Sequence, residues 1–281
     1  MIHLDCGGRV LDLSRTTIMG ILNVTPDSFS DGGIFLSRDA AVAHALTMVE
    51  EGADIIDVGG ESTRPGAQAV SVQEELDRVI PVIEAIARAV PVPVSIDTSK
   101  PEVMRAAVAA GSGLINDVRA LREPGALETA AALQVPVCLM HMQGEPRSMQ
   151  QHPVYADVAV EVRDFLQERI HACVAAGIPR QRIVIDPGFG FGKSAEHNLE
   201  LLRRLGELRT LGMPILAGLS RKSMIGALLG LPVAQRLHAS VALALIAVQN
   251  GAAMLRVHDV RATREAIHMF EAVYPRTGER T

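Results

Sequence analysis

Polar or charged side chains end each of eight short apolar runs in this sequence. The runs are IMGILNV, DIIDVGG, PVSIDT, LINDV, VCLMH, IVIDPG, PILAGLSRK and AMLRVHD. The residues that end them are Asn23, Asp57, Asp97, Asn116, His141, Asp186, Arg221 with Lys222, and Arg256 with His258. Continuous apolar runs of this length are typical of strands covered on both faces, as in a parallel sheet. In parallel strands all eight carboxyl ends meet on one face, where these side chains would line a common cavity.

Four of these side chains could bind a flat heterocycle. The carboxylates of Asp97 and Asp186 could accept paired N–H donors from a guanidine-like ring edge, and the carboxamide of Asn116 both donates and accepts. Lys222 could donate to a ring carbonyl. Capping of the following helices is the alternative role for the acidic residues. It explains one or two of them more easily than the whole set with a lysine opposite.

Basic side chains at other run ends could bind a multiply charged oxyanion such as diphosphate. Arg64, Arg221, Arg256 and His258 follow the second, seventh and eighth runs, and barrel phosphate sites often use the loops after strands seven and eight. Surface salt bridges are the alternative for any single arginine. Arg256 lies within an apolar run, where an unpaired charge would be costly.

Segments with helical spacing lie between the runs. Helices are predicted over residues 39–51, 72–90, 101–110, 155–176, 196–205, 234–250 and 259–273. Eight strand and helix units in about 250 residues predict a TIM (β/α)8 barrel in one domain, residues 1–281, with an open doubly wound sheet as the alternative. Residues 2–14, with Gly7 and Gly8 at their centre, predict a short hairpin that caps the barrel bottom.

Three glycine-rich segments follow strands. TPDSFSDGG (25–33) predicts either a mobile turn or a lid over substrate, and GGESTRPG (59–66) suits an anion. DPGFGFGKS (186–194) is neither a P-loop nor a dinucleotide-binding loop, because Pro187 and Lys193 stand where those motifs need glycine. We interpret it as a loop that lets Phe191 and the backbone surround a flat ring.

Composition excludes several other functions. The net charge is −5 with scattered basic residues, so neither a nucleic-acid stripe nor a polybasic membrane patch is present. Three cysteines without paired spacing argue against a disulfide framework or a thiolate zinc site. We therefore expect a cytoplasmic protein, and no apolar segment is long enough to predict a membrane span. Side chains alternate between the two faces of a strand, so Cys138 and Met140 share one face and His141 lies on the other, which is typical of strand packing. Met140 would then lie in the cavity wall.

IMGILNVTPDSFSDGG (18–33) and GADIIDVGGESTRPGA (52–67) resemble the two signature segments of the dihydropteroate synthase family. The similarity continues in order through SIDTSKPEV, LINDVRAL, VCLMHMQG, DPGFGFGK, LSRKSMIG and RVHDV, over nearly the whole chain. The resemblance implies a pterin-binding TIM barrel, usually a homodimer. It also implies an enzyme that condenses 6-hydroxymethyl-7,8-dihydropterin diphosphate with 4-aminobenzoate, giving 7,8-dihydropteroate and diphosphate, and that sulfonamides inhibit.

The resemblance also assigns roles to individual residues. The pterin would be bound by Asp97, Asn116, Met140, Asp186 and Lys222. The diphosphate would be bound by Asn23, Thr63, Arg256 and His258, with Mg²⁺ at Asn23 and Asp31. The aminobenzoate pocket would be shaped by Phe29, Arg64, Pro65, Phe191 and Ser223. The catalytic groups would be Asp97, Lys222, Arg256 and His258, while Asp57 and His141 would support the site.

Two other functions stay open for such a chain. A pterin-binding methyltransferase domain would not need the loop at 25–33 or the basic residues Arg64, Arg256 and His258. A non-catalytic pterin-binding paralogue should have lost residues of that loop or of that basic set.

An arylamine is neutral at pH 7 and needs little activation, which favours a dissociative substitution without a general base. His238 and Ala239 depart from the family pattern, and we expect them to affect packing or the dimer surface.

Overall fold

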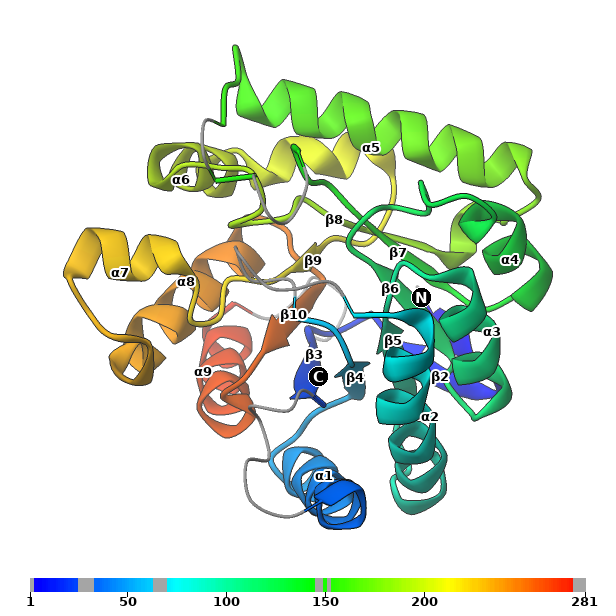
Figure 1. The fold of residues 1–281 in the computed structure, drawn as a ribbon. Coiled ribbons are helices and arrows are strands. Elements are labelled where there is room, and N and C mark those ends of the chain that lie inside the picture. Colours follow the sequence, from blue (N-terminus) through cyan, green and yellow to red (C-terminus); the bar gives the residue numbers. More distant parts are fainter. Residues whose placement is uncertain (1–2, 25–32, 63–69, 145–148, 151–152, 275–281) are drawn as a thin grey trace, which may run out of the picture.

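Eight parallel strands form the centre of the structure (Figure 1). The computed structural model describes residues 3–24, 33–62, 70–144, 149–150 and 153–274. The strands are β3 (Thr17–Asn23), β4 (Ile55–Gly59), β5 (Val94–Asp97), β6 (Leu114–Asp117), β7 (Val137–Met140), β8 (Ile183–Asp186), β9 (Leu216–Ala217) and β10 (Met254–Val257). Their order is β8-β7-β6-β5-β4-β3-β10-β9, and a parallel bridge between Ile185 and Ile215 joins the two ends of this order. The predicted TIM barrel is confirmed, and the open doubly wound sheet is excluded.

Helices surround the strands (Figure 1). They are α1 (Gly33–Glu50), α2 (Val72–Ala89), α3 (Pro101–Ala109), α4 (Ala126–Leu133), α5 (Val158–Ala175), α6 (Ala195–Arg203), α7 (Ser223–Leu229), α8 (Leu237–Gln249) and α9 (Val260–Val273). In α2, Ser71 and Glu74 form a capping box, and Val79, Ile83 and Ile86 bury one face at helical spacing. The start predicted for α8 at residue 234 is wrong, because Val233–Gln235 forms a separate 3₁₀ turn.

The barrel interior changes from apolar to polar along the strands, because alternate residues of a strand point to the same face. Near the amino ends the interior is filled by Met19, Ile55, Leu114, Cys138, Val184, Leu216 and Met254. Two residues further along six of these strands are Asp57, Asn116, Met140, Asp186, Gly218 and Arg256. A packed apolar layer therefore supports a polar layer at the carboxyl ends.

The N-terminal hairpin closes the amino end of the barrel, as predicted. Its strands, β1 (His3–Cys6) and β2 (Arg9–Asp12), pair antiparallel. Leu4, Cys6, Leu11 and Leu13 pack against the apolar interior layer. None of the helices in the described part of the chain is long and apolar enough to cross a membrane.

Gly113→Ala is expected to destabilise the fold without changing the chemistry at the other end of the barrel. A Cβ at Gly113 would lie 2.1 Å from the carbonyl oxygen of Cys6, so the hairpin would have to shift, at a cost of about 1–3 kcal/mol in the free energy of unfolding. Urea unfolding measures this loss. Gly206→Ala is the matched control, because its nearest neighbour would be 3.5 Å away. Equal midpoints for the two variants would contradict the close contact.

Candidate active site

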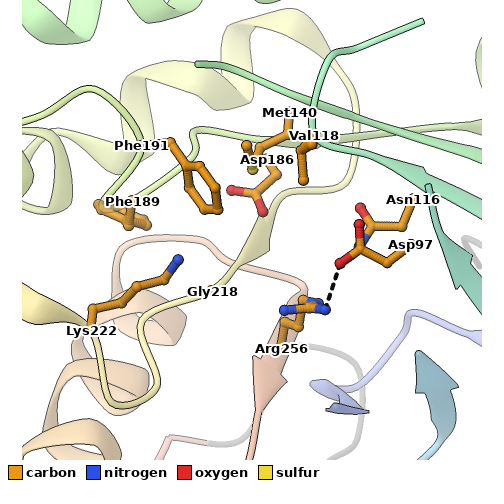
Figure 2. A pocket seen from close by; sticks show the side chains of 10 residues that line it. All are labelled: Asp97, Asn116, Val118, Met140, Asp186, Phe189, Phe191, Gly218, Lys222 and Arg256. Atoms are coloured by element: carbon orange, nitrogen blue, oxygen red, sulfur yellow. Dashed lines mark hydrogen bonds and ion pairs between the residues drawn. The ribbon is translucent and has the colours of Figure 1, made fainter. Parts of the chain in front are cut away.

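A pocket lies among the polar residues at the carboxyl ends of the strands. Its empty volume is about 350 Å³, and it is lined by Asp97, Asn116, Val118, Met140, Asp186, Phe189, Phe191, Gly218, Lys222 and Arg256. Figure 2 shows Lys222 and Phe191 on one side of the pocket and Asp97 and Asn116 on the other. The structure therefore brings together all five side chains that the sequence analysis assigned to the heterocycle.

Arg256 links the carboxylates of Asp57 and Asp97. Its Nε donates to Asp57 Oδ2 at 2.6 Å and its Nη2 donates to Asp97 Oδ2 at 2.8 Å, while Asn116 Nδ2 donates to Asp57 Oδ2 at 3.1 Å. Burial acts to lower the pKa of Arg256, but Asp57 and Asp97 outweigh it and raise that pKa. Arg256 is therefore charged, and it stands within the acidic side of the pocket as well as near the expected anion site.

The charged side chains of the pocket are largely withdrawn from solvent, which shifts their pKa values. Burial raises the pKa of Asp97 to about 7, an effect that Arg256 opposes. Burial also raises the pKa of Asp186, whose Oδ1 accepts a hydrogen bond from the Gly188 N–H at 2.7 Å. Burial lowers the pKa of Lys222 to about 8, and Asp186 opposes that shift. Asp97 and Lys222 can therefore change protonation near neutral pH, which is common at functional sites.

Two phenylalanines and a glycine complete the walls. The Lys222 Nζ lies 4.2 Å from the centre of the Phe191 ring, a cation–π contact that sets the edge of the pocket. Phe189 and Gly218 line the same pocket, and neither was predicted. Strand periodicity could have identified Gly218, because it stands two residues after the interior Leu216.

Three of the residues expected at the diphosphate, Asn23, Arg256 and His258, lie at the carboxyl ends of neighbouring strands. Asn23 is the last residue of β3, and His258 directly follows β10, which pairs with β3. The His258 Nδ1 lies 3.0 Å from the Ser220 Oγ. Burial lowers the pKa of His258 to about 4, and Arg256 and Arg221 add to this effect. His258 is therefore neutral at pH 7 and can act as a hydrogen-bond donor without carrying charge.

Arg221 has a different role from the anion contact considered for it. Its Nε donates to Asp259 Oδ2 at 3.0 Å and its Nη2 donates to Asp259 Oδ1 at 2.5 Å. This bidentate ion pair ties the loop after β9 to the start of α9, so the guanidinium is already engaged. Ser223, expected beside the aminobenzoate, is the first residue of α7 and directly follows Lys222.

Several predicted residues cannot be placed, and others have supporting roles. Phe29, Asp31, Thr63, Arg64 and Pro65 lie outside the described residues. Of the support residues, Asp57 is fully buried beneath Arg256, and His141 is buried against Lys193. In α8, His238 is exposed and Ala239 packs against the core.

A metal ion would find few protein ligands in the described part of the chain. No group of three or more His, Cys, Asp or Glu side chains there could hold a metal ion. Asn23 offers a carboxamide oxygen at the end of β3. Mg²⁺ is usually held by one or two protein oxygens together with phosphate oxygens of a substrate. Asn23 therefore fits a Mg²⁺ that binds with a phosphate-bearing ligand.

Known proteins are similar to this chain in sequence and in structure. Residues 19–258 match the model of the pterin binding enzyme family. The dihydropteroate synthase of Escherichia coli K12 is 57% identical over 271 residues, covering 96% of each chain. The Xanthomonas albilineans dihydropteroate synthase solved with 4-aminobenzoic acid has a TM-score of 0.93 and 58% identity, covering 98% of this chain and 99% of that one.

The same Xanthomonas enzyme has also been solved in complex with 7,8-dihydropteroate. That structure has a TM-score of 0.89 and 55% identity, again over 98% of this chain and 99% of the other. Similarity at this level extends over almost the full length of both chains. The chain therefore belongs to the pterin-binding enzymes and, within them, to the dihydropteroate synthase family.

Proposed function

We propose that this protein condenses 6-hydroxymethyl-7,8-dihydropterin diphosphate with 4-aminobenzoate, giving 7,8-dihydropteroate and diphosphate. The observation that carries the proposal is the convergence of two carboxylates, a carboxamide and a lysine on one small pocket. A related enzyme that is 55% identical binds 7,8-dihydropteroate. The enzyme is thus a transferase that moves a pterinylmethyl group to an arylamine, in folate biosynthesis.

The polar layer supplies the donors and acceptors that a pterin requires. The free Oδ2 of Asp186 would accept from the amino-pyrimidine edge, because its Oδ1 is already bound to the Gly188 N–H. Asn116 can donate and accept, and the Lys222 ammonium can donate to the ring carbonyl. Met140 and Phe191 supply apolar walls on the same pocket. The polar side chains would therefore contact the edge of the ring, and the apolar side chains would contact its face.

The chemical step separates the pterin methylene carbon from a diphosphate oxygen. The electron pair of this bond goes to the oxygen, so negative charge grows there in the transition state. Arg256 and the neutral His258 would stabilise that charge, while Asp97 would stabilise the cation left on the pterinylmethyl group. The lone pair of the 4-aminobenzoate nitrogen then forms the new bond to carbon, and the proton that this nitrogen loses passes to the released diphosphate or to solvent.

Mg²⁺ is the cofactor that we propose, with Asn23 and Asp31 as its protein ligands. When bound, it would neutralise charge on the diphosphate oxygens. Asn23 remains beside the diphosphate in this arrangement, because it ends β3 next to the strand that carries Arg256.

Two further expectations concern the molecule as a whole. We propose a homodimer. Exposed apolar side chains at the end of α7, in the 3₁₀ turn that follows it and on α8, namely Leu228, Leu229, Val233 and Ile246, offer a surface for a second copy. A cytoplasmic location is likewise a proposal, supported by three buried free cysteines.

The pH dependence of kcat/KM for the pterin substrate is expected to be bell-shaped, with apparent pKa values of about 7 and about 8. Below the first value Asp97 gains a proton and loses its negative charge. Above the second value Lys222 loses its positive charge. Because these groups interact, both values belong to the site as a whole. Lys222→Arg should abolish the fall of kcat/KM at high pH, since arginine stays charged. If kcat/KM of that variant still falls as in the wild type, a group other than Lys222 causes the fall.

Product formation tests the proposed function. Purified protein with Mg²⁺, the pterin diphosphate and radiolabelled aminobenzoate is expected to form labelled dihydropteroate. No label in dihydropteroate at high enzyme concentration would favour the non-catalytic paralogue. A sulfonamide is expected to raise the KM for aminobenzoate and leave kcat unchanged, because it imitates that substrate.

A further inference from the structure

The loop after β8 packs with its backbone directly against the segment after β7. Gly188, Gly190 and Gly192 have φ values of 68°, 81° and 60°, which favour glycine. A Cβ at Gly188 would lie 1.8 Å from the His141 carbonyl oxygen, and one at Gly192 would lie 2.3 Å from the Gln143 carbonyl oxygen. Only glycine fits so close an approach, and the loop conformation is therefore well defined.

Lys193 ends this loop and turns its ammonium back into it. The Nζ donates to the carbonyl oxygen of Gly188 at 2.9 Å, to that of Phe191 at 3.1 Å and to His141 Nδ1 at 2.8 Å. Lys193 is only 2% exposed. An ammonium has three N–H donors, so each has one acceptor here. With no donor left over and no access to solvent, this lysine is not available to a phosphate.

The third acceptor depends on His141 being neutral. Burial lowers the pKa of His141 to about 2, and Lys193 adds to this shift. Because an ammonium cannot accept, its contact with Nδ1 requires the neutral tautomer with the proton on Nε2, which leaves the Nδ1 lone pair as the acceptor. Burial lowers the pKa of Lys193 to about 7, although Asp186 opposes this, so the ammonium is the main form below neutral pH and the affinities of the variants are compared there.

The two carbonyls that Lys193 holds belong to residues that control the pocket. The Gly188 N–H fixes Asp186 Oδ1 at 2.7 Å, and Phe191 N–H donates to the Gly188 oxygen at 3.1 Å. The Phe191 ring in turn contacts Lys222. Other loop groups have different partners: Asn198 Oδ1 accepts from Gly190 N–H at 2.7 Å, and the Tyr155 hydroxyl donates to the Gly192 oxygen at 2.8 Å.

We propose that Lys193 is a positioning residue for the pterin pocket, which holds Gly188 and Phe191 so that Asp186 and the Phe191 ring face the bound pterin. The inference rests on the proposed function and adds to it a residue that touches no substrate. A purely structural lysine would stabilise the fold without changing the affinity of the folded protein for the pterin. The two roles therefore predict different binding data.

Lys193→Met tests this role, because methionine keeps much of the aliphatic stem and removes the ammonium. The dissociation constant of the pterin diphosphate, measured by calorimetry without aminobenzoate, is expected to rise about ten-fold or more, since small displacements of positioning groups are costly. Arg9→Met is the matched control. Arg9 is the first residue of β2 in the hairpin, at the opposite end of the barrel from the pocket, and it donates to the carbonyl oxygens of Val92 at 2.5 Å and Ala87 at 2.6 Å. Arg9→Met should lower thermal stability and leave the dissociation constant unchanged.

A second pair of variants leaves Lys193 in place and changes its acceptor. Asn at position 141 can present an oxygen near the position of the imidazole Nδ1, whereas Leu presents no acceptor. We expect His141→Asn to bind the pterin diphosphate close to the wild-type affinity, and His141→Leu to bind about ten-fold more weakly or worse. This pair decides the question if Lys193→Met fails to fold.

The outcomes separate the inference from the proposed function. Wild-type affinity in a folded Lys193→Met variant, or equal affinities in the two His141 variants, would overturn the positioning role and leave the function intact. Failure of the wild-type protein to bind the pterin diphosphate would overturn both.

Discussion

Arg256→Met is expected to lower kcat by about 10²- to 10³-fold while weakening pterin binding much less. The reason is that the guanidinium acts mainly on charge that develops as the diphosphate departs, and the loss of one such group typically costs this much. Single-turnover kinetics with equilibrium binding of the pterin substrate measure the two effects separately. Equal losses in affinity and turnover would contradict this role.

The same substitution is expected to destabilise the fold, because it leaves the buried carboxylates of Asp57 and Asp97 without their cation. Removing one partner of a buried ion pair costs about 3–5 kcal/mol. Adding Asp57→Asn removes one of the two orphaned charges, so the double variant should recover stability. It should not recover kcat, because the cation is still missing. Recovery of both would show that Arg256 acts only through the fold.

Asp186→Asn is expected to weaken pterin binding by about 10²-fold, the loss of up to about 3 kcal/mol for a hydrogen bond to a charged group. The carboxamide oxygen can still accept from the Gly188 N–H, so the loop stays in place. The other position becomes an NH₂ donor that faces the donors of the ring. Calorimetry with the pterin diphosphate measures the change.

The stability of the Asp186→Asn variant should stay the same or rise at pH 7. Burial raises the pKa of Asp186, which means that its charged form is disfavoured in the folded state, and a neutral amide avoids that cost. Asp157→Asn is the matched control. Asp157 caps α5, and Asn is an equally good cap, so affinity and stability should both change little. A loss of affinity no larger than that of this control would remove Asp186 from the pterin site.

Much of the fold could be predicted from local sequence. The strands β3 to β10 follow from apolar runs, and the polar ends at Asp97, Asn116 and Asp186 follow from parallel pairing at a common face. The helices α4 and α7 could not be predicted in this way. Gly125 begins α4 without a side-chain cap, and α7 has only seven residues, so neither has a clear start signal or enough turns to show periodicity.

The contacts between distant strands could not be predicted from spacing. Arg256 meets Asp57 and Asp97 only because β10, β4 and β5 come to the same level in the closed barrel, which depends on the register of every pair between them. The sequence therefore placed Arg256 with the anion alone. Lys193 was noted only as a residue that breaks a nucleotide-binding motif, because nothing in the local pattern shows that its ammonium returns to carbonyls two and five residues earlier.

The central claim is that one pocket, made by the polar layer of the barrel, binds the pterin and directs its diphosphate toward Arg256. A crystal structure of the protein with Mg²⁺ and a non-reactive analogue of the pterin diphosphate tests this claim most directly. We predict the ring between Asn116, Asp186 and Lys222, with the diphosphate within hydrogen-bond distance of Arg256 and His258. A ring bound elsewhere, or a diphosphate directed away from β10, would contradict the account.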